Sequence, residues 1–171
     1  MLGSSRDALA LCGGALEQLS GEVNRAEIGS ELFSIAALLD SENVLRFALA
    51  DSGQGVEIRK SLAAEVFGTR VGIAATELLV IAVAQRWSED VDLVLALEEL
   101  GAQAILTAAQ NENTLDATEE EIFLFGRAVD QSADLQMALT NPATVGSSKS
   151  AIVAELLHTN ATSATRELLE Y

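Results

Sequence analysis

The sequence predicts an all-α protein, and three observations support this fold class. Apolar residues make up 49% of the chain, and many are Ala and Leu, which favour helices and close contact between helices. The single proline, Pro142, leaves little to interrupt a helix. Alternating runs of Val, Ile, Thr and aromatic residues between turns, which would predict strands, are missing from the sequence.

The sequence also contains an internal repeat with a period of 90 residues. Residues 31–79 align with residues 121–169 without a gap, and 13 of these 49 positions are identical. Asp40 and Asp130 take the same place near the end of a predicted helix in both copies. A shared rhythm of this kind indicates duplication more strongly than a shared Ala- and Leu-rich composition does.

The repeat defines the predicted domains. We expect a six-helix bundle over residues 1–110, followed by a second, incomplete helical copy over residues 111–171 that shares the long sixth helix. Leu93-Val94-Leu95-Ala96-Leu97 in this sixth helix is apolar nearly all round, as a helix shared by two cores should be. No closing helix follows in the second copy, which indicates a truncated chain or an incomplete repeat.

Apolar periodicity and capping residues place the helices. In the first copy, Asn24 and Glu27 resemble a capping box, Gly68 ends a helix, and Ser88 is expected to be the N-cap of the sixth helix. The predicted spans are 5–19, 24–39, 42–50, 56–67, 71–86 and 89–110, and the helix over 56–67 is expected to face inward through Ile58, Leu62 and Val66.

The second copy repeats these signals. Thr118 and Glu121 predict a capping box before a helix that contains Ile122, Phe125 and Val129. Three short helices are expected after it, over residues 133–139, 147–157 and 162–171.

Charge limits the classes of partner. Ten basic and 26 acidic residues give a formal net charge of −16. Such a surface repels phosphate backbones and anionic lipid head groups, so we expect no nucleic-acid binding and no direct membrane insertion. No signal-peptide pattern is recognised, and the single cysteine, Cys12, fits a reduced cytosolic setting. Basic segments or apolar helices remain as the expected partners.

No set of residues predicts chemistry, so we expect no catalytic residue, cofactor or metal. Glu155 and His158 have the Glu-x-x-His spacing of di-iron bundles, but this is the only His and such a site needs two pairs. Cys12 lies on an apolar helix face and is interpreted as a small core residue. The run Glu119-Glu120-Glu121 is interpreted as a first-turn cluster that the helix dipole favours.

The helix over residues 71–86 is the feature that raises the question of a partner. Val71, Ile73, Leu78 and Val80 are among apolar residues that occupy most of its circumference. Either this helix is central and fully buried, or one of its sides forms a groove for a partner helix. Trp87 directly after it is interpreted as an anchor against the next helix.

Several stretches resemble one known family, the delta subunit of F-type ATP synthase, which is called the oligomycin-sensitivity-conferring protein in mitochondria. The stretch that ends in Ala48-Leu49-Ala50-Asp51 carries this resemblance. Gln85-Arg86-Trp87-Ser88 and Glu121-Ile122-Phe123-Leu124-Phe125-Gly126-Arg127 resemble the actinobacterial branch, which has a duplicated helical region. The resemblance covers nearly the whole chain, but its motifs are less specific than a catalytic signature.

The resemblance implies a stator link that joins the catalytic head to the peripheral stalk at the cytoplasmic face of the plasma membrane. It implies that the amino-terminal amphipathic helix of an alpha subunit binds between helices 1 and 5. The corresponding candidates are Ala8, Leu11, Ala15, Ile73, Glu77, Val80, Ile81 and Ala84. The family's carboxy-terminal region, which contains strands and binds the stalk b subunit, has no counterpart in the sequence. Much of the b-subunit contact should therefore be missing.

Two alternatives remain open. A generic helical adaptor would also bind an amphipathic helix, so only the identity of the partner separates it from the stator link. A small-molecule enzyme or sensor would need a closed cavity with convergent polar residues, which the sequence does not predict.

Overall fold

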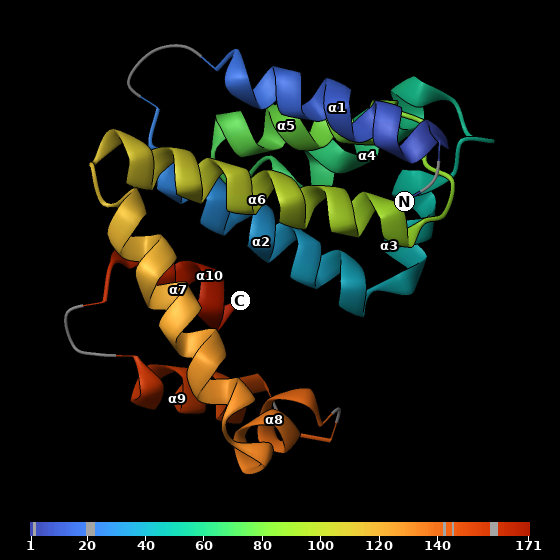
Figure 1. Ribbon diagram of the computed structural model, residues 1–171. Coiled ribbons are helices and arrows are strands. Elements are labelled where there is room, and N and C mark those ends of the chain that lie inside the picture. The colour runs from blue at the N-terminus through green and yellow to red at the C-terminus, as the bar shows by residue number, and fades with distance from the viewer. Residues whose placement is uncertain (2, 20–22, 142, 145, 158–160) are drawn as a thin grey trace. The chain divides into compact units, whose positions relative to one another are not determined.

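The computed structural model describes residues 1, 3–19, 23–141, 143–144, 146–157 and 161–171. These residues form ten helices and no strand, so the all-α prediction is confirmed (Figure 1). The helices are α1 (Gly3–Glu17), α2 (Arg25–Ser41), α3 (Asn43–Ala50), α4 (Val56–Phe67), α5 (Ile73–Ala84), α6 (Val91–Asn111), α7 (Leu115–Asp130), α8 (Ala133–Thr140), α9 (Gly146–Leu156) and α10 (Ser163–Glu170).

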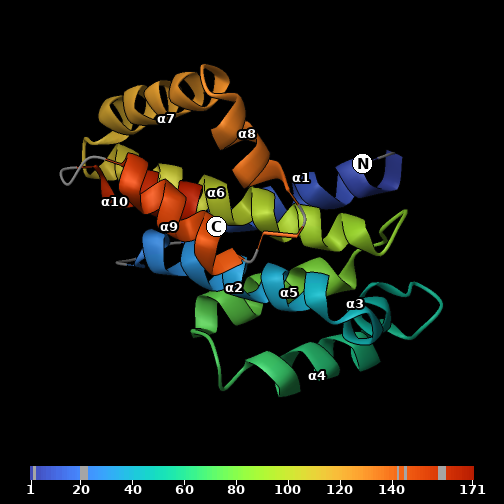
Figure 2. The same cartoon turned by 90° about the horizontal axis from the view of Figure 1, so that it is seen from below.

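The helices form two compact units, Met1–Ile105 and Leu106–Tyr171, and the boundary between the units falls inside α6. In the first unit, α5 contacts α1, α2 and α4. Figure 2 shows α5 lying between α1 and α4. The core of this unit is aliphatic, and its fully buried side chains include Leu32, Leu39, Leu79 and Leu97.

Helices α2 and α6 of the first unit approach each other closely where they cross. A Cβ atom added to Gly29 would lie 2.7 Å from the carbonyl oxygen of Gly101 and 2.5 Å from Cγ1 of Ile105. A Cβ atom added to Gly101 would lie 2.8 Å from the ring of Phe33. These distances are too short for a side chain, so the crossing requires glycine at both positions.

Helix α4 packs against the core through Leu62 and Val66, as predicted, but not through Ile58. Its bounds are as expected, but Ile58 is 62% exposed, whereas Arg59, Ala63 and Phe67 are buried. The prediction of an inward Ile58 was wrong because hydrophobic spacing gives no weight to arginine. Here the Arg59 guanidinium donates hydrogen bonds to the carbonyl oxygens of Val83 and Gln85, which compensates its burial.

Two predicted caps were also wrong. Helix α6 begins at Val91, and the backbone N–H of Ser88 instead donates to Oγ of Ser5. Thr118 lies inside α7, where its hydroxyl bonds to the carbonyl oxygen of Thr114. In each case a tertiary hydrogen bond or an earlier helix start replaces the expected local cap. The Asn24 cap of α2 is confirmed, because its side chain accepts from the N–H of Glu27.

The helices of the second unit match those of the first when the sequence is shifted by 90 residues. Adding 90 to the bounds of α3 gives residues 133–140, which are the bounds of α8. The turn after each helix is also the same: Gly53 N–H bonds to the side chain of Asp51 at 2.8 Å, and Ala143 N–H bonds to that of Asn141 at 2.9 Å.

The second unit has a much smaller core. Among its described residues, the buried apolar side chains are Ala109, Val153 and Ala164. At equivalent places where the first unit buries Leu32 and Ile35, the second unit leaves Ile122 and Phe125 half-buried.

Candidate helix-binding site

Helix α5 is buried on one side and open on the other. The buried side is formed by Ala75, Leu78, Leu79, Ala82 and Val83. The open side contains exposed Ile73 and Glu77 and half-buried Val80, Ile81 and Ala84. Helix α5 therefore lies centrally in the first unit without being fully buried, and its outer side offers an apolar surface with one charged residue.

The structure brings most of the predicted binding residues together on two neighbouring helices, because α1 packs against α5. On α1, Leu11 is 61% exposed and Ala15 is half-buried, whereas Ala8 is buried in the core at 3% exposure. On α5, Ile73 is 81% exposed. Leu11 and Ile73 are therefore open to a partner, and Ala8 instead stabilises the packing of α1.

Three side chains hold the ends of α5 in place. The carboxylate of Glu31 accepts the N–H of Gly72 at 2.7 Å, directly before the helix. At the other end, Arg59 donates to the last carbonyl groups, where a cation also opposes the negative end of the helix dipole. Trp87 is 5% exposed, and its indole N–H donates to the carbonyl oxygen of Ala82 at 2.9 Å. Trp87 thus anchors the end of α5 itself.

The start of α1 is held by a buried polar group that the sequence did not indicate. Ser5 is fully buried, and its hydroxyl donates to the carboxylate of Asp92 at 2.6 Å. The Ser5 oxygen also accepts the N–H of Ser88 at 2.8 Å. Because these residues lie more than 80 positions apart, no local pattern could have identified the contact.

Acidic side chains lie beside the open apolar surface. On α1, Asp7 lies one turn before Leu11, and on α5, Glu77 lies one turn after Ile73; both carboxylates are exposed. A partner helix that fits this surface needs an apolar stripe with basic residues at its border.

Neither the Cys12 thiol nor the acidic side chains that the structure describes indicate a nucleophile or a metal site. Burial raises the pKa of the Cys12 thiol to about 11, so the thiol is protonated near neutral pH. The described residues contain no cluster of three or more His, Cys, Asp or Glu side chains able to hold a metal ion. The Glu155–His158 pair cannot be assessed, because His158 lies outside the described residues.

The three glutamates of α7 are not in its first turn, because α7 begins at Leu115. Glu121 instead accepts hydrogen bonds from the N–H of Thr162 at 3.0 Å and from the hydroxyls of Thr162 and Thr165. Burial alone would raise the pKa of Glu121, but these hydrogen bonds and the nearby Arg166 outweigh it and lower the pKa. Glu121 thus caps α10 as Glu31 caps α5.

Each unit has a small apolar hollow at the same place in the repeat. The first, of about 170 Å3, is lined by Ser34, Ile35, Leu38, Phe67, Arg70 and Val71. The second, of about 140 Å3, is lined by Glu121, Leu124, Phe125, Ala128, Leu156, Leu157 and Ala161. Neither contains convergent polar groups suited to a small substrate.

The described residues define an all-helical protein with an open apolar surface on α1 and α5. Residues 101–171 match the sequence profile of the family described as ATP synthase delta (OSCP) subunit. The chain is 40% identical to ATP synthase subunit delta of Streptomyces avermitilis over 169 residues, which cover 98% of this chain and 62% of the relative. The corresponding protein of Streptomyces coelicolor is 39% identical over 171 residues, which cover 99% of this chain and 62% of the relative. In Nocardia farcinica the identity is 41% over 145 residues, covering 85% of this chain and 54% of the relative.

The sequence resemblance to the ATP synthase delta (OSCP) subunit family is confirmed at the level of similarity, because residues 101–171 match this family and the chain is similar to ATP synthase subunit delta of Streptomyces. It spans about 62% of the length of the Streptomyces relatives. In the part of the chain that the structure describes, no helix is both long and apolar enough to cross a bilayer.

Proposed function

We propose that the chain is part of a stator component of an F-type ATP synthase, linking the catalytic head to the peripheral stalk. The work of a stator is mechanical: it resists torque through a large contact and needs no turnover. Similarity to the ATP synthase delta (OSCP) subunit family supports this role, and the open apolar surface on α1 and α5 would supply a contact of the required kind. Burial of apolar surface stabilises such a contact by roughly 25 cal/mol per Å2.

The proposed ligand is the amino-terminal amphipathic helix of an alpha subunit, lying along α1 and α5. The observation that carries the proposal is the exposure of Ile73 and Leu11, which stay open although both follow the apolar pattern of their helices. Half-buried Ala15, Val80, Ile81 and Ala84 would form the floor of the groove, and Glu77 would pair with a basic residue of the ligand.

We further propose that the chain is a six-helix bundle followed by a second, incomplete copy. Equivalent hydrogen bonds in both units support the duplication. Glu31 to Gly72 corresponds to Glu121 to Thr162 after the shift of 90 residues. The side chains of Arg46 and Gln136, also equivalent, both donate to the carbonyl oxygen of an aspartate, Asp40 or Asp130.

The match of residues 101–171 to the family raises the question of which copy binds the alpha subunit. The chemistry of the outer faces favours the first copy. Where α5 has Ile73 and Val80, α10 has Ser163 and Glu170, which give no apolar stripe. The proposal therefore places the groove on α5.

In the assembled enzyme, the chain would lie at the cytoplasmic face of the plasma membrane without inserting into it. Contacts with the stalk b subunit would come largely from a region outside these 171 residues, as the resemblance implies. The relatives' remaining length is consistent with such a region.

The groove can be tested with a peptide of the first twenty or so residues of the cognate alpha subunit. We expect saturable one-to-one binding by calorimetry, with a gain of helical circular dichroism by the peptide. Ile73→Asp should weaken this binding by tenfold or more, because it places a charge in the apolar contact without disturbing the core. The matched control is Val44→Asp on α3, where the side chain is 85% exposed outside the groove.

Equal binding by both variants would exclude the α1–α5 groove. Absence of binding at high micromolar concentration would favour the alternative of a general helical adaptor for another amphipathic helix.

A further inference from the structure

The two walls of the α1–α5 groove run in opposite directions. The hydroxyl oxygens of Ser4 and Ser88 lie 2.9 Å apart, and the N–H of Ser88 donates to the hydroxyl oxygen of Ser5. Ser88 comes shortly after Ala84, the last residue of α5, so the start of α1 lies beside the end of α5. Because α1 also packs against α5, the two helices are antiparallel walls of one groove.

The wall formed by α1 carries Asp7. A Cβ atom added to Gly13 would lie 3.8 Å from Oε1 of Gln103, so the side of α1 that contains Gly13 faces α6. Asp7 and Leu11 lie one turn apart on the side of α1 away from Gly13. Both side chains are exposed. Asp7 therefore borders the groove near the start of α1.

The wall formed by α5 carries Glu77. This residue lies one turn after Ile73, the first residue of α5, and its side chain is exposed. Helix α5 contains no basic residue, and neither Asp7 nor Glu77 has a hydrogen bond or an ion pair among the described residues. Because the walls are antiparallel, these two carboxylates lie on opposite walls and near opposite ends of the groove.

This diagonal of carboxylates sets the spacing of the charges that a bound helix must carry. Six residues advance a helix by about 9 Å and turn it about 120° short of two full turns. An apolar stripe is roughly as wide, so residues i and i+6 lie on its two borders. The order of α5, α1 and α6 gives the diagonal the hand of this spacing. Turning the bound helix end for end exchanges Asp7 and Glu77, so the spacing holds for either direction.

We propose that the α1–α5 groove selects an amphipathic helix with two basic residues six positions apart, one on each border of its apolar stripe. The inference rests on the proposed function, because it concerns the ligand of the same groove. The pattern of charge then determines which apolar helix binds, since a helix with both basic residues on one border leaves Asp7 or Glu77 unpaired.

Two amphipathic peptides of identical composition test the spacing against the full chain. One has Lys at positions i and i+6, and the other has Lys at positions i and i+7, which places both on the same border. Calorimetric titration at low salt should show about two- to fivefold tighter binding of the i, i+6 peptide, because it forms one more exposed ion pair. The preference should disappear at high salt, which screens exposed charges.

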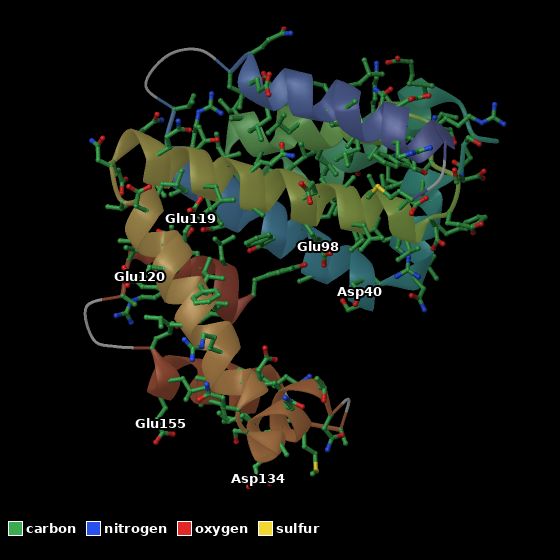
Figure 3. The ribbon with its side chains drawn as sticks, in the orientation of Figure 1. Asp40, Glu98, Glu119, Glu120, Asp134 and Glu155 are labelled. Atoms are coloured by element: carbon green, nitrogen blue, oxygen red, sulfur yellow. The ribbon has the colours of Figure 1, made fainter. Side chains whose placement is uncertain are left out.

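Charge reversal on the protein tests the same pairs. Asp7→Lys and Glu77→Lys should each weaken binding of the i, i+6 peptide at least about threefold, because each replaces an ion pair by repulsion. The chain with both changes should prefer a peptide that has Glu at positions i and i+6. The matched control is Glu120→Lys, since Glu120 is exposed on α7 of the second unit (Figure 3).

Equal affinity of the two Lys peptides, lost in Ile73→Asp, would overturn the charge pattern and leave the groove in place. Equal weakening by Glu120→Lys would also overturn it, because net charge alone would then explain the effect. Absence of binding by both peptides would overturn the groove together with its charge pattern.

Discussion

The two units of this chain have equivalent helices but very different cores. The bounds of α8 are those of α3 shifted by 90 residues, and Glu31 and Glu121 cap equivalent helices. Yet the first unit buries large side chains such as Leu32 and Leu97, whereas Val153 is the largest buried apolar residue that the structure describes in the second. Helix positions thus depend on local signals, whereas the Glu31 and Glu121 caps and the cores depend on residues that the fold brings together from distant parts of the sequence.

The largest difference should appear when equivalent core residues are truncated. Leu32→Ala should lower the free energy of unfolding of the first unit by about 2–5 kcal/mol, because it leaves a cavity among fully buried neighbours. Ile122→Ala at the equivalent, half-buried place should cost the second unit less than about 2 kcal/mol. Denaturant unfolding with alkylation of buried Cys12 reports on the first unit alone. Equal losses in both units would contradict the difference between the cores.

Glycine-to-alanine changes should have opposite signs in the two units. Gly29→Ala should destabilise the first unit by about 1–3 kcal/mol, because its methyl group would overlap α6. Gly126→Ala should stabilise α7 by about 0.4–1 kcal/mol, since its methyl group meets open space. Scanning calorimetry should show a lower transition temperature for Gly29→Ala than for the unchanged chain. For Gly126→Ala the transition temperature should not fall. A loss of stability in Gly126→Ala would reveal an internal contact at that face.

The cap on α10 should make the second unit sensitive to acid. Because hydrogen bonds lower the pKa of folded Glu121, its stabilising contribution is complete above the pKa of an unfolded glutamate and is lost as the pH falls through the folded pKa. Glu121→Gln should cost about 0.5–1.5 kcal/mol at pH 7 and make stability less dependent on pH below 5. Amide hydrogen exchange at Thr162 measures the effect. Glu120→Gln is the control, because it removes the same charge from an exposed neighbour; an identical response would exclude the cap.

The smallest effect on stability should come from giving the outer side of α5 the residue that α10 has at the equivalent position. Ile73→Ser introduces the residue found at position 163, and Ile73 is 81% exposed, so stability should change by no more than about 0.5 kcal/mol. Affinity for the alpha-subunit peptide should nevertheless fall several-fold, because the apolar contact is lost. Unchanged affinity would show that the outer face of α5 is not the binding surface.

The candidate site was implied by the family resemblance and not by periodicity alone. The apolar circumference of α5 left two possibilities open, a fully buried helix or a helix with one side free for a partner, and in the structure Leu11, Ile73 and Glu77 are exposed. The burial of Ala8 was not predictable, since periodicity places a residue on a helix face without showing which neighbour covers it. The exposure of Phe123 was not predictable for a similar reason: Phe123 aligns with Phe33 in the repeat, and only the structure shows that Phe33 is covered and Phe123 is not.

The sequence by itself determined the all-α class, the repeat, most helix bounds and the Asn24 cap, because these depend on residues within a few positions of one another. Tertiary structure alone decided which polar groups are buried. Arg59 caps the end of α5 by a hydrogen bond to a residue 24 positions away in the sequence. The hydroxyl of Ser5 donates to the carboxylate of Asp92, which lies 87 positions away. A buried polar side chain is stable only beside a suitable partner, and folding, not local pattern, selects that partner.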